Sequence, residues 1–372
     1  MKLVIATPLY PPDIGGPATY AALLSKGLIE KGHTVSLVKF GDVRHMPKVI
    51  RHLAYFFHVL RALKSADAVL ALDPVSVGLP TYIAARRMKK PFVVKIVGDY
   101  AWEQGRQRFG VTMSLDEFVN TRKVPLMVRF LRKVQTRVAK SAAFVIVPSE
   151  YLKKIVNAWG VTNDDIHVIY NAVSGGEKSA VPQPVAELSR PIVVTAGRLV
   201  LWKRIDGIID AVAHLRTENT KKNNSGVVSL VVVGDGPECA RLSTHAKEVL
   251  GNDYLFTGAL SHAELLAVIQ SADVFVLNSS YEGLSHTLIE ALACASPIIA
   301  TRVGGNEEVL DGYSGAIFVS GHDESELSDA LGSMILEKNM RSRLQTEASH
   351  VAKRFSPEAM SDTTISALSK LL

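Results

Sequence analysis

Apolar and polar positions change along the chain in a regular way that predicts buried strands and amphipathic helices in turn. In the first half, strands are predicted at residues 2–7, 33–40, 67–72, 91–98 and 142–149. Helical periodicity covers residues 18–32, 47–65, 77–90, 116–140 and 149–160. Strands that alternate with helices of this length are typical of parallel sheets covered on both faces.

The same alternation begins again after residues 173–190, whose Gly, Pro and Ser residues lack periodicity and indicate a linker. Strands are predicted at 192–197, 228–234, 254–258, 273–279 and 296–301, with helices between them. We therefore predict two doubly wound, Rossmann-like α/β domains, over residues 1–172 and 191–355. Because such sheets bind ligands outside the carboxyl ends of their strands, we expect the two domains to face each other across a ligand cleft.

Composition and charge narrow the class of protein. Hydrophobic residues make up 47% of the 372 residues and charged residues 21%, which is typical of a globular protein. Cys239 and Cys294 are the only cysteines, so we expect neither a disulfide framework nor a zinc site. Such low cysteine usage indicates a reducing compartment. We see no signal peptide and no run of roughly 20 apolar residues that would span a bilayer, so a cytoplasmic location is expected.

The net charge of +6 conceals an asymmetry between the two halves. Residues 1–186 carry 26 Lys and Arg against 13 Asp and Glu, whereas the remainder carries 16 against 23. A basic half indicates contact with something anionic: nucleic acid, a membrane surface or a phosphorylated substrate. No nucleic-acid-binding motif is recognisable, which argues against nucleic acid as the anionic partner.

Much of the positive charge lies in the predicted helix over residues 116–140. Its basic residues are Arg122, Lys123, Arg129, Arg132, Lys133, Arg137 and Lys140, interleaved with Val, Leu, Met and Phe. A basic amphipathic helix can lie on the anionic inner face of a membrane. A helix that packs on its own sheet with a solvated basic face has the same pattern, and both interpretations stay open.

Two carboxylates eight positions apart, Glu282 and Glu290, lie in the mostly apolar or small segment YEGLSHTLIEALACASPIIA. They suggest a catalytic pair, two parts of a ligand clamp or a solvated helix face. Eight helical residues span roughly 12 Å, whereas a retaining glycosidase needs carboxyls about 5–5.5 Å apart, so a hydrolytic pair fits poorly. Sugar and ribose hydroxyls are groups that each carboxylate can bind.

Other candidate ligand residues follow predicted strands. Arg198 and Lys203 come after the strand at 192–197 and suit a diphosphate. Gly234, Asp235 and Gly236 follow the next strand, where glycine lets backbone approach a ligand or simply forms a tight turn. Gly15 and Gly16 precede the first helix, as in an anion-binding turn.

In combination, the motifs EGLSHTLIE, GRLVLWK and GDGP and the Gly15–Gly16 loop resemble glycosyltransferase family four, whose fold is called GT-B. The tail RFSPEAM resembles the family's helix that crosses back to the first domain, here over residues 356–372. The resemblance covers nearly the whole chain. It implies a retaining, metal-independent transfer from a nucleotide-diphosphate sugar to a carbohydrate or lipid-linked acceptor, with no cofactor, and the sequence has no Asp-x-Asp metal pair.

The resemblance also implies roles for single positions. Glu290 would hold the ribose, Glu282 the transferred sugar, and Arg198 and Lys203 the diphosphate leaving group, whose developing charge they would stabilise. Backbone N–H groups along one short segment would meet the sugar and diphosphate. That segment consists of Gly283, Leu284, Ser285, His286 and Thr287.

One position departs from the family's pattern. Many relatives carry a donor-contacting His after the fourth strand of the first domain, where this chain has KIVGDYAWEQG, with Asp99 and no His. Asp99 could contact the sugar or act as a base on the acceptor, or it could cap a loop. Two alternatives to a glycosyltransferase stay open, a non-catalytic nucleotide- or sugar-binding protein of this fold and a related sugar-nucleotide epimerase.

Overall fold

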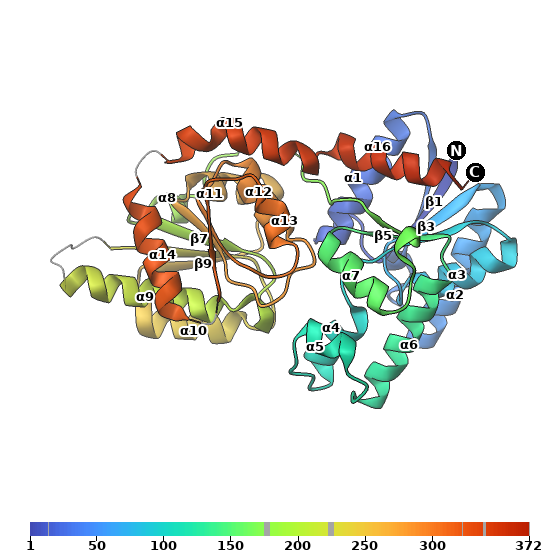
Figure 1. The fold of residues 1–372 in the computed structure, drawn as a ribbon, viewed down its shortest axis with the longest axis horizontal. Coiled ribbons are helices and arrows are strands. Elements are labelled where there is room, and N and C mark those ends of the chain that lie inside the picture. Colours follow the sequence, from blue (N-terminus) through green and yellow to red (C-terminus); the bar gives the residue numbers. More distant parts are fainter. Residues whose placement is uncertain (14, 175–178, 222–226, 322, 338–339, 372) are drawn as a thin grey trace. The chain divides into compact units, whose positions relative to one another are not determined.

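The computed structural model describes residues 1–13, 15–174, 179–221, 227–321, 323–337 and 340–371. The chain divides into two compact units, which we describe separately: unit 1 is Met1–Ser174 with Phe355–Leu372, and unit 2 is Gly175–Arg354. Each contains a six-stranded sheet flanked by helices (Figure 1). The predicted class, two doubly wound α/β domains, is confirmed. Of the predicted linker over 173–190, residues 175–178 lie outside the described residues, and the rest includes a short helix, α8 (Gln183–Ala186).

Unit 1 is built on a fully parallel sheet with the strand order β2-β1-β3-β4-β5-β6. Its strands are β1 (Lys2–Thr7), β2 (Thr34–Lys39), β3 (Ala68–Ala71), β4 (Phe92–Lys95), β5 (Phe144–Val147) and β6 (Ile166–Val168). The chain places β2 on one side of β1 and then returns to place β3 on the other side. The central strands β3, β4 and β5 are buried along their whole length, which explains their unbroken apolar sequence.

Helices connect these strands, and one returns from the far end of the sequence. They are α1 (Gly16–Glu30), α2 (Lys48–Ala62), α3 (Gly78–Met88), α4 (Tyr100–Arg108), α5 (Leu115–Asn120), α6 (Leu126–Lys140), α7 (Glu150–Ala158) and α16 (Pro357–Ser369). Helix α16 packs along α1 (Figure 1), so closely that a Cβ added to Gly27 would collide with the Ser361 hydroxyl. The end of the chain therefore contributes to the core of unit 1.

The single helix predicted over residues 116–140 is wrong, because the structure has two helices, α5 and α6, separated by residues 121–125. Pro125 explains the break. It is the residue that precedes α6, and a proline disfavours helical backbone at the residue before it. Residues Val128, Gln135, Val138 and Ala139 of α6 are buried, while its basic side chains Arg129, Lys133, Arg137 and Lys140 are exposed.

Unit 2 is also a fully parallel sheet, with the order β12-β11-β10-β7-β8-β9. Its strands are β7 (Ile192–Ala196), β8 (Ser229–Val233), β9 (Tyr254–Gly258), β10 (Val274–Leu277), β11 (Ile298–Thr301) and β12 (Ala316–Val319). Its longer helices are α9 (Ile205–Lys221), α10 (Cys239–Leu250), α11 (His262–Ser271), α12 (His286–Ala293), α13 (Asn306–Leu310), α14 (Glu324–Leu336) and α15 (Met340–Ala352). Helices α9, α10 and α14 pack together on one face of the sheet, and α11, α12 and α15 on the other (Figure 1).

Short 3-10 helices complete both units: Phe40–Val43, Leu63–Ser65, Asn163–Asp165, Leu201–Lys203 and Lys353–Phe355. The apolar side chains of β7, β8, β10 and α9 form a buried core in unit 2.

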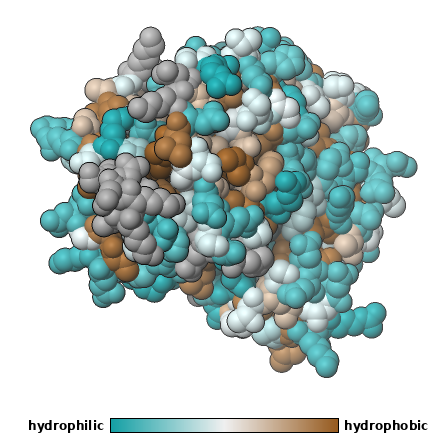
Figure 2. Space-filling view, turned by 60° about the vertical axis from the view of Figure 1, so that its left-hand side comes forward, coloured by the Kyte–Doolittle hydropathy of each residue, from teal (hydrophilic) through white to brown (hydrophobic). Residues whose placement is uncertain are grey.

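On the face of the molecule shown in Figure 2, hydrophilic residues predominate and hydrophobic ones show as small separate areas. Burial of the strands between two helical layers therefore accounts for the fold, as the sequence pattern predicts.

Candidate functional site

The sheet of unit 2 changes direction between β7 and β10. The chain builds β7, β8 and β9 outward on one side, and then places β10 on the other side of β7. Ligands of open α/β sheets bind at such a switch point, outside the carboxyl ends of the strands. The loop after β7 begins at Gly197 and leads into the 3-10 helix Leu201–Lys203, and the loop after β10 leads into α12. The switch point thus brings two of the predicted motifs together.

An ion pair joins these two loops. Lys203 Nζ lies 2.6 Å from Glu282 Oε1, although the residues are 79 positions apart. The Lys203 side chain is 15% exposed and that of Glu282 is 10% exposed. The hydroxyl of Ser279 donates a second hydrogen bond of 2.5 Å to the same carboxylate oxygen. A largely buried lysine and glutamate therefore form a charged centre at the switch point, open enough for a ligand to touch.

Arg198 differs from Lys203 in its environment. Its side chain is exposed, and no hydrogen bond or ion pair joins it to another residue that the structure describes. An exposed guanidinium in the loop that also carries Lys203 is available to an anion from solvent.

The glycines after β7 and β8 let the two loops cross at close range. Gly234 has a φ of +127°, and a Cβ there would collide with the Gly197 carbonyl oxygen. A Cβ at Gly236 would collide in the same way with the Leu199 carbonyl oxygen. Asp235 is exposed, and its carboxylate accepts a hydrogen bond of 2.6 Å from the Gly236 N–H. These contacts support tight loop packing as the reason for both glycines, which shapes the loop that carries Arg198.

The segment Gly283–Thr287 leads into α12, which begins at His286. Ser285 is the N-cap, and its hydroxyl accepts a hydrogen bond of 3.3 Å from the Leu288 N–H. Gly283, Leu284 and Ser285 are buried, while His286 and Thr287 are half-buried. The next loop presses on this segment, because a Cβ at Gly304 would collide with the Glu282 carbonyl oxygen. Gly304 is a supporting residue that sequence analysis missed, although the pair Gly304–Gly305 after a predicted strand was a visible signal.

Glu290 has a partner that the sequence did not reveal. It lies on α12 and is only 7% exposed, so the interpretation as a solvated helix face is wrong. Its Oε1 lies 3.1 Å from Nε2 of His262, the first residue of α11. This contact raises the pKa of His262. Oε2 of Glu290 is buried and has no hydrogen-bond partner among the described residues. The two glutamates therefore have separate surroundings, Glu282 beside Lys203 and Glu290 beside His262.

The remaining predicted residues belong to unit 1. Gly15, with a φ of +142°, is the N-cap of α1, and its carbonyl accepts hydrogen bonds from the N–H groups of Ala18 and Thr19. Gly16 is the first residue of that helix. Their neighbour at position 14 lies outside the described residues. A φ in this region favours glycine, which explains the first of the pair.

Asp99 is the N-cap of α4 and accepts a hydrogen bond of 2.9 Å from the Trp102 N–H. It is 1% exposed, and burial raises the pKa of its carboxyl, while hydrogen bonds from Gln135 and Trp102 oppose that rise. The geometry supports the capping alternative over a catalytic base.

Across the residues described, the structure contains no group of three or more His, Cys, Asp or Glu side chains that could hold a metal ion. A search of the same residues finds no helix that is both long and apolar enough to span a membrane.

Two protein-family models match this chain. The family described as Glycosyltransferase Family 4 matches residues 14–174, and the family described as Glycosyl transferases group 1 matches residues 178–351. The chain belongs to glycosyltransferase family four. Both halves of the family's architecture are therefore present, and the resemblance inferred from the motifs is confirmed.

Relatives of known sequence within the family are distant. An uncharacterized glycosyltransferase of Methanocaldococcus jannaschii is 29% identical over 54% of this chain and 52% of its own length. An N-acetyl-alpha-D-glucosaminyl L-malate synthase of Bacillus anthracis is 25% identical over 83% of this chain and 81% of its own. For the first relatives that it matches, the chain spans only about half of their length.

Solved structures of the family's fold are similar over the whole chain. HepE of Anabaena, in complex with UDP and glucose, has a TM-score of 0.77 at 16% identity, with 100% of both chains covered. The sucrose-phosphate synthase of Thermosynechococcus elongatus has a TM-score of 0.75 at 18% identity, covering 100% of this chain and 98% of its own. At such identities the likeness shows the fold alone.

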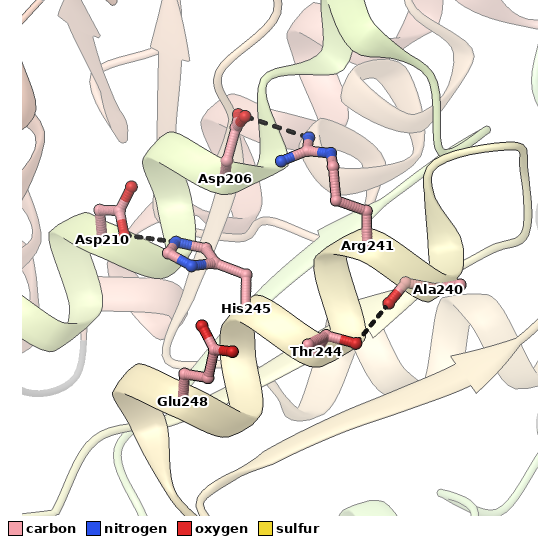
Figure 3. Close-up of a pocket in the computed structure, with 7 residues that line it drawn as sticks. All are labelled: Asp206, Asp210, Ala240, Arg241, Thr244, His245 and Glu248. Carbon is pink, nitrogen blue, oxygen red and sulfur yellow. Dashed lines mark hydrogen bonds and ion pairs between the residues drawn. The ribbon is translucent and has the colours of Figure 1, made fainter.

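A pocket of about 660 Å³ lies between α9 and α10 of unit 2 (Figure 3). Charged side chains that already pair with one another line it: His245 Nε2 lies 2.6 Å from Asp210 Oδ1, and Arg241 lies 3.2 Å from Asp206. None of the site residues predicted from the sequence lines this pocket, so we assign it no role in the family's chemistry.

Proposed function

We propose that the protein is a retaining glycosyltransferase that moves a sugar from a nucleotide-diphosphate sugar to a carbohydrate or lipid-linked acceptor. The observation that carries the proposal is the Lys203–Glu282 pair, 2.6 Å apart at the switch point of the sheet in unit 2. It combines a cation for a diphosphate with a carboxylate for sugar hydroxyls in one largely buried place. Membership of the family supports the same donor class, and so do the HepE structures, which are complexes with UDP and with UDP-glucose.

The proposed chemistry is electrostatic. As the bond between the sugar and the diphosphate breaks, negative charge develops on the leaving phosphate, and Lys203 with the exposed Arg198 would stabilise it. Glu282 would hold hydroxyls of the transferred sugar, and Glu290 those of the ribose. With two cations in one loop, the leaving group needs no metal ion in this proposal, and retention of the anomeric configuration follows from the family resemblance.

A thermal-shift screen against UDP-, GDP- and ADP-sugars tests donor binding. A ligand present at 100 times its Kd stabilises the folded protein by about 2.7 kcal/mol, so one base should raise the Tm above the others. Failure of all three to raise the Tm contradicts the proposal.

Turnover separates the enzyme from its alternatives. We expect the selected donor to release its nucleoside diphosphate only when acceptor is present, and Glu282→Ala and Lys203→Ala to slow that release about 100-fold or more. Donor binding without release would favour the non-catalytic binding protein. Conversion of the donor into another sugar nucleotide without an acceptor would favour the epimerase.

We further propose that unit 1 contacts an anionic lipid surface through α6, as a lipid-linked acceptor would require. Leu126 is 80% exposed, Met127 50% and Phe130 58%, next to the exposed cations Arg129 and Lys133. Large apolar side chains rarely remain so exposed beside cations unless something covers them, and an acidic bilayer matches both features.

A further inference from the structure

The contact between His262 and Glu290 is the feature of unit 2 that the proposed roles leave unexplained. Nε2 of the imidazole lies 3.1 Å from Oε1 of the carboxylate. The His262 side chain is 38% exposed and the Glu290 side chain 9% exposed, so the imidazole is the part of the pair that solvent reaches more easily. Among the residues that the structure describes, this nearly buried carboxylate therefore has one hydrogen-bond partner, a partly exposed imidazole.

Helix starts and helix packing fix this contact in place. Ser261 and Glu264 form a capping box at the start of α11, which sets the direction in which His262 leaves the helix. Helix α11 packs against α12, whose Leu288 and Leu292 are fully buried and hold Glu290 at its position along the helix. These contacts fix the backbone positions of both residues, so their side chains start from defined places.

The carboxylate of Glu290 is incompletely satisfied. Oε2 is covered and accepts no hydrogen bond from a described residue, which is costly for a charged oxygen. Oε1 has a second lone pair beyond the one that faces His262. The carboxylate can therefore accept further hydrogen bonds from a ligand that carries two neighbouring hydroxyls, the arrangement of a ribose.

We propose that His262 is a positioning residue, which holds the Glu290 carboxylate so that it selects the two hydroxyls of the donor's ribose. This proposal rests on the proposed function, because it assumes a nucleotide-sugar at this site. His262 acts through Glu290, by a hydrogen bond that gains strength when the imidazole is protonated. The protonated imidazole also offsets the charge of Glu290 when a bound nucleotide removes it from water.

Among the described residues, few other charged or titratable groups lie near this pair. The thiol of Cys294, the C-cap of α12, lies near Glu290, and burial raises its pKa to about 11, with Glu290 adding to the rise. Arg341 of α15 donates a hydrogen bond of 2.9 Å to the Cys294 carbonyl. Glu264 is engaged with Ser261. Because Cys294 and Arg341 keep their charge states between pH 5.5 and pH 8.5, neither changes the ligand affinity over that range, and comparison of wild type with His262→Gln isolates the contribution of His262.

The test measures the Kd of UDP-glucose, or of the donor that the thermal-shift screen selects, between pH 5.5 and 8.5. A nucleotide-diphosphate sugar has no phosphate that titrates in this range, so the ligand itself does not change. The pKa of His262 is raised, so we expect wild-type affinity to be highest at low pH and to fall as the pH passes that pKa. His262→Ala should weaken binding roughly tenfold or more at low pH.

Two further variants separate positioning from a general loss of structure. In His262→Gln, an amide that donates but does not titrate should keep most of the affinity and remove the pH dependence. His245→Gln is the matched control, since it changes another histidine–carboxylate pair of unit 2, on α10 and outside the proposed site, and should leave the wild-type pH profile intact.

A 2′-deoxyribose form of the same nucleotide supplies the second readout. We expect wild type to prefer the ribose form, and His262→Ala to lose most of that preference. The proposal is overturned if His262→Gln keeps the wild-type pH profile, or if His262→Ala keeps the ribose preference. If His262→Ala does not fold, the glutamine variant alone decides. Failure of wild type to bind any nucleotide-sugar would instead refute the proposed function.

Discussion

Replacing Lys203 by methionine should destabilise unit 2, because among the described residues only the Ser279 hydroxyl would then donate to the Glu282 carboxylate. Removing one partner of a fully buried ion pair costs about 3–5 kcal/mol. The two side chains are 15% and 10% exposed, and one hydrogen bond remains, so we expect a loss of about 2–3 kcal/mol. Urea unfolding measures this loss as a lower midpoint at an unchanged slope.

The double variant Lys203→Met/Glu282→Gln distinguishes a stranded charge from a lost contact. The glutamine is neutral and its amide oxygen still accepts from Ser279, so at least half of the lost stability should return. Turnover should not return, because Lys203 is the proposed diphosphate cation and its loss alone should lower the rate about 100- to 1,000-fold. Recovered stability without recovered activity would show that the pair has both roles.

The matched control is Lys247→Met, which removes an exposed lysine of α10 in the same unit. It should change the free energy of unfolding by no more than about 0.5 kcal/mol. Our reasoning is refuted if Lys203→Met unfolds at the same urea concentration as Lys247→Met. It is equally refuted if the double variant is no more stable than Lys203→Met.

Three further predictions concern other parts of the chain. Gly234→Ala should lower the Tm strongly and weaken donor binding, because its Cβ would collide with the Gly197 carbonyl, whereas Gly251→Ala, with a φ of +67° and open space around it, should cost only about 1 kcal/mol. Asp99→Asn should keep turnover. Burial raises the Asp99 pKa, so ionisation of that carboxyl destabilises wild type as the pH rises through the raised pKa. Over that pH range, unfolding measurements should show the variant gaining stability relative to wild type. A large loss of turnover would restore Asp99 as a base. Phe130→Asp should reduce co-sedimentation with anionic vesicles and leave turnover of a water-soluble acceptor unchanged, and equal sedimentation of both proteins would contradict the membrane proposal.

The sequence predicted the architecture well where burial alone decides the pattern. The apolar runs at β3, β5, β7 and β10 are buried on both faces of their sheets, so their signal is strong. Strands β6 and β12 were missed. They are only three and four residues long and partly exposed, which leaves little apolar pattern to read.

The sequence predicted the candidate site residues but not which of them contact one another. Motifs identified Glu282, Lys203 and Glu290 as candidates, because carboxylates and cations after strand ends are visible in a sequence. Lys203 contacts Glu282 because the strand order switches between β7 and β10. Glu290 contacts His262 because α11 packs on α12. Such contacts arise from strand order and helix register, which residue types alone do not specify.

Because α16 packs on α1, unit 1 can complete its folding only when synthesis of the chain has ended. Unit 1 needs Phe355–Leu372, yet those residues leave the ribosome only after the whole of Gly175–Arg354 has been made. At 5–20 residues per second, these roughly 180 residues take about 10–40 s. During that interval the apolar face of α1 that later meets α16 lacks its partner, so the nascent chain offers a temporary binding surface to chaperones, and a ribosome that stalls within unit 2 leaves the first unit unfinished.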